Sequence, residues 1–224
     1  MPSRRNPTDP PPLSRAPSFE PERDFARLLD RSAIAGLDEA GRGALAGPVF
    51  AAAVILPFAD DSCLKHLAGV NDSKQLPAAA RERLFPLICE TALAYGIGRA
   101  EAAEIDAIGI VPATRLAMSR ALERLASPAD ALLVDGTLRL DSPLAQRSLV
   151  RGDSLSLSIA AASVLAKVSR DRVMVELDGR FPGYGFAAHK GYGTALHLRA
   201  LAQAGPCREH RFSFAPLAGR AGST

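Results

Sequence analysis

A short apolar run that ends at an acidic pair constrains this chain more than any other feature. Residues 33–37 are apolar, Asp38 and Glu39 follow them, and a glycine-rich segment at 41–47 leads into a second apolar run at 48–56. The β-branched residues and bounding glycines are typical of a strand, a turn and a second strand. Because no helix begins after the glycines, the segment does not fit a dinucleotide-binding loop, which holds pyrophosphate at a helix N-terminus.

The rest of the chain alternates between helical and strand-like patterns. Helices are predicted over residues 77–90, 102–108, 112–125 and 155–177, and strands over 92–99, 131–134 and 146–150. The longest predicted helix carries small residues at 160–163 and 166, which allow close packing. Strands that come first and helices interleaved with later strands indicate one α/β domain with a mixed sheet flanked by helices.

Length and composition indicate which part of the chain forms the domain. The 224 residues fit one domain, which we assign to 29–217. Residues 1–28 are rich in Pro, Arg and Ser and are predicted to be a disordered tail, and 218–224 a flexible C-terminus. Three scattered cysteines argue against a disulfide framework and predict a cytoplasmic protein. No apolar run is long enough to span a membrane, and a net charge of +3 permits nucleic-acid binding without requiring it.

Three acidic sites share one context, because each follows an apolar, strand-like run. They are Asp38 with Glu39, then Asp135, then Asp153. Strand ends are where sites gather in α/β sheets, and clustered carboxylates usually hold one or two hard divalent cations. The sequence therefore predicts a metal site.

Two points about these acids stay open at the level of sequence. Neighbouring strand residues point to opposite faces, so Asp38 and Glu39 share a site only if the strand ends there and the turn redirects Glu39. Gly41 and Gly43 would give the turn that freedom. Each acid alone could also be structural, and Asp153 could be a plain N-cap of the long helix.

The same residues resemble the ribonuclease HII family, the bacterial type 2 ribonucleases H. The opening motif is Gly-Leu-Asp-Glu-Ala-Gly-Arg-Gly at residues 36–43, and the likeness runs in order from about residue 33 to 217. Further matching segments lie at residues 47–49, 51–54, 71–74, 134–136, 152–153, 158–163, 166–168, 170–171, 189–194, 210–211 and 213–214. Departures at Ala44, Gln75 and Pro77 put fine substrate contacts in doubt rather than activity, because none of them touches the four acids.

The resemblance implies a ribonuclease H-like mixed sheet with a helical C-terminal part. It also implies a Mg²⁺- or Mn²⁺-dependent endonuclease, with two ions during catalysis, that acts on RNA–DNA hybrids. Such an enzyme cuts 5′ of ribonucleotides embedded in duplex DNA, leaving 3′-hydroxyl and 5′-phosphate ends. The metal-binding catalytic residues would be Asp38, Glu39, Asp135 and Asp153.

Substrate contacts are predicted at two sets of residues. The resemblance assigns ribose sensing to Gly41, Arg42, Gly43 and Tyr192. Contacts to the substrate backbone are predicted at Ser73, Lys74, Lys167, Arg170 and Lys190; lysine is rare in this arginine-rich chain, and a retained lysine suits a phosphate. The alternatives are a half-buried tyrosine without a role, a solvated basic face, and a surface pair of Lys167 with Asp171 at i,i+4 spacing.

Two other functions remain as alternatives. One is another carboxylate-metal nuclease of the same fold, such as a junction resolvase. The other is a non-catalytic nucleic-acid-binding module, although four acids beside a polyanion would weaken binding in the absence of metal. The resemblance favours the ribonuclease, acting as a monomer without a membrane partner.

Overall fold

Five strands form one mixed sheet at the centre of the molecule. The computed structural model describes residues 16–218, and the strand order is β3-β2-β1-β4-β5. The strands are β1 (Ile34–Ala40), β2 (Val49–Ile55), β3 (Ala94–Ala100), β4 (Ala131–Asp135) and β5 (Ala145–Leu149). β1 pairs with β2 and β2 with β3 in antiparallel fashion, whereas β1–β4 and β4–β5 are parallel. The predicted mixed sheet is confirmed.

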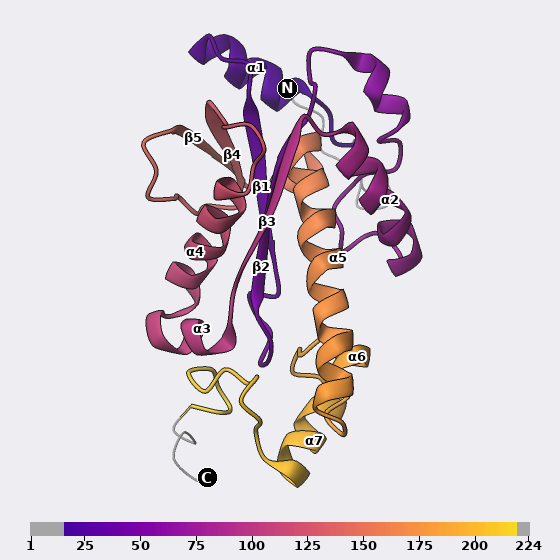
Figure 1. Ribbon diagram of the computed structural model, residues 1–224, viewed down its shortest axis with the longest axis vertical. Helices are drawn as coiled ribbons and strands as arrows, with labels where there is room; N and C mark the ends of the chain where they lie inside the picture. Colours follow the sequence, from indigo (N-terminus) through magenta and orange to yellow (C-terminus); the bar gives the residue numbers. More distant parts are fainter. Residues whose placement is uncertain (1–15, 219–224) are drawn as a thin grey trace, which may run out of the picture.

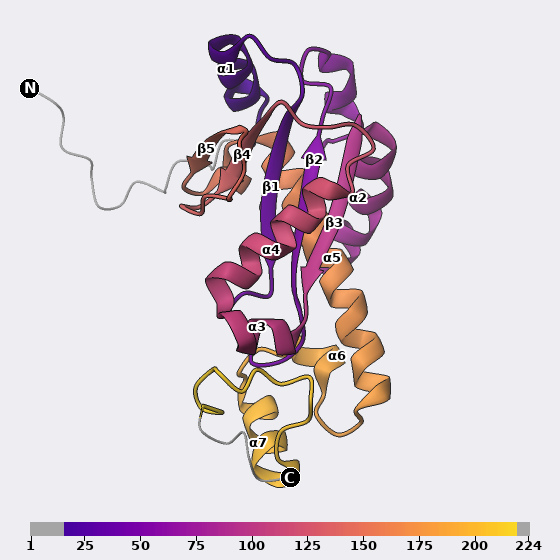
Figure 2. The same ribbon diagram turned by 60° about the vertical axis from the view of Figure 1, so that its left-hand side comes forward.

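Helices cover both faces of this sheet (Figures 1 and 2). α5 (Leu157–Arg180) and α2 (Ala78–Thr91) lie on one face, and α3 (Ala102–Ile108) and α4 (Ile110–Glu123) on the other. The predicted small-residue face of α5 is confirmed, since its alanines at 160–162 and 166 are fully buried. A Cβ at Gly36 of β1 would overlap the α5 backbone at Ser158. Strand and helix therefore approach more closely than ordinary side chains allow.

The C-terminal part is helical, as the resemblance implies, and lies at one end of the sheet (Figure 2). It contains α6 (Phe186–His189) and α7 (Ala195–Ala204). A separate core cluster holds it together and includes Tyr184 and Phe186, whose rings stack at 5.3 Å. An isolated bridge between Ala46 and His210 joins this part to the loop between β1 and β2.

The N-terminal boundary of the predicted domain is wrong. Residues 20–28, predicted to be part of a disordered tail, belong to α1 (Glu20–Leu29). This segment is ordered by burial, because Phe19 and Phe25 enter the main core and Glu22 is buried beside α5. Residues 1–15 of the predicted tail and residues 219–224 of the predicted C-terminus lie outside the described residues.

The other predicted elements differ from the structure only at their ends. Pro77 is the N-cap of α2, and β1 continues through Ala40, beyond the apolar run that predicted it. Two short 3-10 helices, η1 (Asp61–Lys65) and η2 (Gly152–Ser154), were not predicted. No helix among residues 16–218 has the length and apolar character needed to cross a membrane.

Candidate active site

Three of the four predicted catalytic acids come together beside the middle of β1, where β4 ends. Carboxylate oxygens of Asp38, Asp135 and Asp153 all lie within 4.8 Å of one another, and we call these residues the aspartate cluster. Parallel pairing of β1 with β4 sets Leu37 opposite Val134, so the next residues, Asp38 and Asp135, are neighbours. Asp153 joins them from η2, just before α5. The three carboxylates therefore converge as predicted, although only Asp135 lies at the end of a strand.

Glu39 lies beside the aspartate cluster rather than in it. The condition that the strand ends at this pair is not met, because Glu39 still pairs with Ala51 and Ala40 with Phe50 in the antiparallel ladder. Its side chain therefore leaves the strand on the opposite face from Asp38. It lies 3.5 Å from a guanidinium nitrogen of Arg42. Burial raises the pKa of Glu39, Arg42 lowers it, and the charge of Asp135 raises it, so Glu39 is electrostatically linked to the cluster.

Backbone amides hold the cluster in place. The amide of Gly152 donates to Oδ1 of Asp135 at 2.7 Å, and the amide of Glu39 donates to Oδ1 of Asp38 at 2.7 Å. The alternative role of Asp153 as N-cap of the long helix is excluded, because Ser156 caps α5 by accepting from the Ile159 amide. The Asp153 carboxylate thus has no capping role in α5.

The electrostatics of the cluster favour a bound cation. Burial raises the pKa of Asp38 well above its usual range, and the charges of Glu39 and Asp135 raise it further. Burial and Asp135 raise the pKa of Asp153 to about 6. Partial burial lowers the pKa of Lys74, but the charges of the nearby acids, Asp38 first, together raise it above its usual value. Hard, closely spaced oxygen donors with surplus negative charge fit Mg²⁺ or Mn²⁺.

Asp72 is a further acid at this site that the sequence did not single out. After burial and Asp135, the charge of Asp72 is the next cause that raises the pKa of Asp153. Asp72 also accepts from the backbone amide of Lys74 at 2.9 Å. A cavity of 570 Å³ lies here, and its lining includes Asp72, Lys74, Asp135 and Asp153. The matching Asn-Asp-Ser-Lys segment at 71–74 was the available signal, but it follows no strand.

The glycine turn at residues 41–43, called the Gly41 turn below, has two different glycines. Gly41 has φ of 87°, which is the left-handed region, and a Cβ there would overlap the side chain of Arg170. Gly43 has no such φ, and a Cβ on it would meet no atom within 4 Å. Only Gly41 therefore supplies conformational freedom. Gly43 leaves open space through which a ligand can approach the backbone.

Tyr192 is partly exposed beside this turn. The residue is 38% exposed, and the centroid of its ring lies 5.4 Å from Cζ of Arg170. His197 Nδ1 lies 3.0 Å from the Tyr192 carbonyl oxygen and helps to fix the backbone there. The structure thus brings together the Gly41 turn and Tyr192, which are about 150 residues apart in sequence.

Two residues that were predicted to contact the substrate backbone, Ser73 and Arg170, are buried in the structure. Ser73 is buried and its hydroxyl accepts from Ser163 Oγ at 2.7 Å, so it anchors its loop on α5. Arg170 is fully buried and donates to the carbonyls of Ala46 and Pro48, so no phosphate reaches it in this structure. An α-helical pattern alone does not reveal that this part of α5 is covered by the β1–β2 loop.

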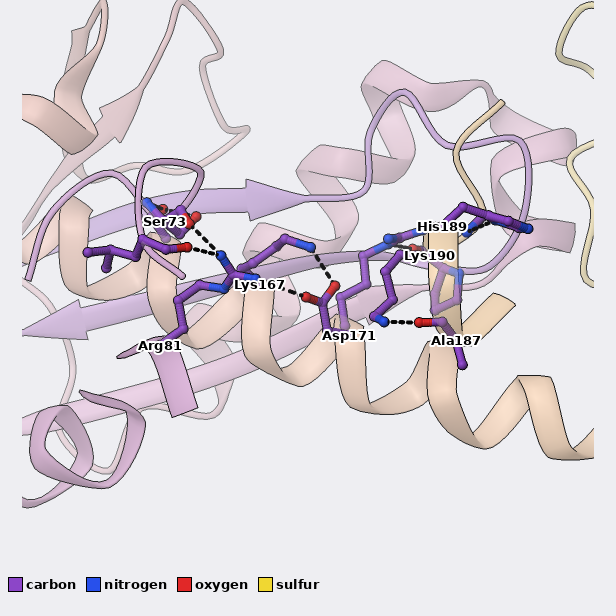
Figure 3. A network of polar contacts seen from close by, with 12 residues as sticks. Ser73, Arg81, Lys167, Asp171, Ala187, His189 and Lys190 are labelled. Carbon is purple, nitrogen blue, oxygen red and sulfur yellow. Dashed lines mark hydrogen bonds and ion pairs between the residues drawn. The ribbon is translucent and has the colours of Figure 1, made fainter. Parts of the chain in front are cut away.

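Two of the remaining predicted basic contacts, Lys167 and Lys190, line a groove beside α5 (Figure 3). Lys167 Nζ is 2.5 Å from Asp171 Oδ1, as the i,i+4 alternative predicted, and Arg81 lies 3.5 Å from the same carboxylate. Lys190 donates to the carbonyl of Ala187. Lys74 lies apart from this groove, next to the aspartate cluster.

Other residues that shape the site were missed. Glu22 accepts from the Ser156 hydroxyl at 2.7 Å and from the Ser158 amide at 2.8 Å, and so holds the start of α5 next to Asp153. Pro21 with acidic neighbours is a helix-start signal that could have predicted α1. Arg211 is fully buried and donates to the Gly41 carbonyl. Residues 210–211 belong to a segment that matches the family, but nothing in the local sequence indicates that Arg211 is buried.

A mixed five-stranded sheet with an aspartate cluster formed by central β1, the end of β4 and η2, just before α5, is the arrangement of a metal-dependent nuclease of the ribonuclease H fold. Residues 35–217 match the sequence model of the family described as Ribonuclease HII. The chain therefore belongs to the ribonuclease HII family, whose members are divalent-metal-dependent hydrolases acting on RNA–DNA hybrids.

Individual relatives agree with this assignment. The Ribonuclease HII of Syntrophotalea carbinolica is 61% identical over 193 residues, covering 85% of this chain and 90% of that protein. That of Chloroflexus aurantiacus is 55% identical over 201 residues, covering 90% and 94%. The crystal structure of ribonuclease H2 from Pyrococcus horikoshii superposes with a TM-score of 0.70 at 24% identity, covering 82% of this chain and 94% of that one, and confirms the fold.

Proposed function

We propose that the enzyme cuts 5′ of ribonucleotides embedded in duplex DNA as well as within RNA–DNA hybrids. The products would carry 3′-hydroxyl and 5′-phosphate ends, and the role would be removal of ribonucleotides from DNA. The observation that carries this proposal is the position of the Gly41 turn, three residues after Asp38 of the aspartate cluster. A group that contacts the 2′-hydroxyl there distinguishes RNA from DNA next to the reacting phosphate.

The proposed metal ligands are Asp38, Asp135 and Asp153, with Glu39 as a fourth. To bind a metal ion, Glu39 would have to leave Arg42, which lies 3.5 Å away, and reach the cluster from the opposite face of β1. Two divalent cations, Mg²⁺ or Mn²⁺, would supply an activated water and stabilise the leaving oxygen. Lys74 offsets part of the negative charge of the cluster and is available for a phosphate contact.

The groove beside α5 supports a path for the nucleic-acid backbone. This cavity of 700 Å³ is lined by four basic side chains, Arg81, Lys167, Arg172 and Lys190, and by three acidic ones, Glu82, Asp171 and Glu176. Figure 3 shows Lys167 and Arg81 gathered around Asp171. Phosphates attract such side chains in competition with Asp171, so we propose Lys167 and Lys190 as contacts to phosphates that flank the cut.

The decisive experiment compares four substrates with and without a chelator. They are a DNA duplex with one ribonucleotide, the same duplex without it, a uniform RNA–DNA hybrid and a four-way DNA junction. Cleavage only where ribose is present, only with Mg²⁺ or Mn²⁺, and only 5′ of the single ribonucleotide supports the proposal. Equal cleavage of the all-DNA duplex or junction would indicate a resolvase-type nuclease, and binding without cleavage would indicate a binding module. We also propose a monomer, which sedimentation measurements test directly.

A further inference from the structure

A buried arginine without an acidic partner lies between the Gly41 turn and Tyr192. Arg170 of α5 is 0% exposed, and its Nε donates to Pro48 O at 2.9 Å and its Nη2 to Ala46 O at 3.1 Å. Within residues 16–218 it takes part in no ion pair, and its Nη1 has no hydrogen-bond partner. A buried, uncompensated charge costs free energy that an apolar side chain of similar volume would avoid. Packing alone therefore does not account for this arginine.

The Gly41 turn and Tyr192 together form the predicted ribose sensor. The guanidinium of Arg170 contacts both of them. A Cβ at Gly41 would overlap its Nε and Cζ, so the turn lies in direct contact with the guanidinium. The same Cζ lies 5.4 Å from the centroid of the Tyr192 ring, within the range of a cation–π interaction. One rigid, planar group thus sets the separation between the turn and the ring.

A second buried arginine holds the turn from the C-terminal segment. Arg211 is 0% exposed, and it donates to the carbonyls of Gly41 at 2.8 Å and Arg42 at 2.9 Å. With these carbonyls directed inward, the amides of Arg42 and Gly43 have no protein acceptor in the described part of the chain. Those amides are free to donate to an oxygen of a ligand.

The two arginines also place positive charge behind the turn. Burial lowers the pKa of Arg211, and the neighbouring charge of Arg170 lowers it further, which shows that the two cations repel each other. Such a pair is tolerated more readily when an anion lies in front of it. A phosphodiester group next to the bound ribose is the anion that this site would receive.

We propose that Arg170 and Arg211 are positioning residues that fix the Gly41 turn relative to Tyr192, so that the site accepts one ribose beside a phosphodiester group. This inference rests on the proposed function. A duplex with one ribonucleotide can be cut in only one binding position, whereas a uniform hybrid can be cut in many. Loosening the sensor should therefore impair cleavage at a single ribonucleotide more than cleavage of a hybrid.

The test compares kcat/KM on these two substrates for the wild type, Arg170→Lys, Arg170→Met and Arg211→Lys. Arg115→Met is the matched control, since Arg115 is an exposed arginine on α4, away from the site. Lysine keeps the charge but loses the planar fork of donors. Each variant at Arg170 or Arg211 should lower the ratio of single-ribonucleotide to hybrid kcat/KM, by on the order of 10²-fold at most. Arg115→Met should leave the ratio unchanged.

Thermal unfolding separates positioning from folding. Equal losses on both substrates in a folded variant, or a wild-type ratio in Arg170→Lys, would overturn the proposal. If neither lysine variant folds, the pair serves stability alone and the proposal is also overturned. If the wild type itself does not cut at a single ribonucleotide, the proposed function fails rather than the link between the arginines and the turn.

Discussion

Asp38 and Asp135 directly follow the paired residues Leu37 and Val134 in the parallel ladder of β1 and β4. Their carboxylates therefore leave two adjacent strands on the same face of the sheet, toward α5. Neither position can be shifted by a loop movement, because both strands are buried in the centre of the sheet. This pairing provides two fixed carboxylates, to which η2 adds Asp153.

Replacing Asp38 with Asn should abolish cleavage while leaving substrate binding intact. The variant loses a metal ligand but keeps the shape of the side chain, so the rate should fall by on the order of 10³-fold or more. Binding in the absence of metal should stay the same or become tighter, because a negative charge next to a polyanion is removed. Single-turnover cleavage and a binding assay in chelator measure the two effects, and unchanged activity would remove Asp38 from the site.

Asp153→Asn should stabilise the metal-free enzyme above pH 6. The pKa of Asp153 is raised to about 6 from 3.8, so the charged carboxylate costs stability at neutral pH. That cost disappears as pH falls from about 6 toward 3.8, and the variant should lack this part of the pH dependence. Thermal unfolding in chelator across this range checks the difference. The variant should also show a smaller rise in Tm with Mn²⁺, and an undiminished rise would exclude Asp153 as a ligand.

Glu22→Ala should destabilise the fold through the start of α5. The carboxylate accepts two hydrogen bonds from α5, so the loss should be about 1–3 kcal/mol in the free energy of unfolding. Glu22→Gln is the matched control, because Oε1 accepts both bonds and burial already raises the pKa of Glu22. Denaturant unfolding should show a much smaller loss for Gln than for Ala. Equal losses would mean that the negative charge, rather than the acceptor, is what α5 requires.

Acid should weaken the C-terminal part through its buried histidines. Burial lowers the pKa of His210 to about 4 from 6.5, and its Nε2 lies 3.0 Å from that of His197. Because the unfolded histidine is protonated below pH 6.5 and the folded one only near pH 4, the free energy of unfolding falls as pH drops from 6.5 toward 4. Asp153 changes stability in the opposite direction over part of this range, so the comparison must be between variants. His210→Gln should flatten the dependence of Tm on pH in this window, and an unchanged slope would contradict the assignment.

The sequence predicted those parts of the site that depend on local pattern. Asp38, Asp135 and Asp153 each follow a strand-like run, and parallel pairing alone brings two of them together. The orientation of Glu39 depends on how far the ladder with β2 continues, which is a matter of register rather than of residue type. The role of Glu22 depends on contacts with Ser156, 134 residues away, in a segment whose composition suggested disorder. Such tertiary contacts leave no periodic signal in one sequence.

Substituting the two glycines of the turn should separate folding from function. In Gly41→Ala the new Cβ would meet the Arg170 side chain in a backbone conformation that L-residues rarely adopt, so the variant should lose stability by about 1–3 kcal/mol and lose activity. In Gly43→Ala the new Cβ enters open space and no unusual φ is required. That variant should keep the wild-type Tm, but its methyl group would occupy the approach to the free amides of Arg42 and Gly43. Its KM for a single-ribonucleotide duplex should therefore rise while Tm does not change. A Gly43→Ala enzyme with wild-type kinetics would show that the ribose does not approach this turn, whatever the effect at Gly41.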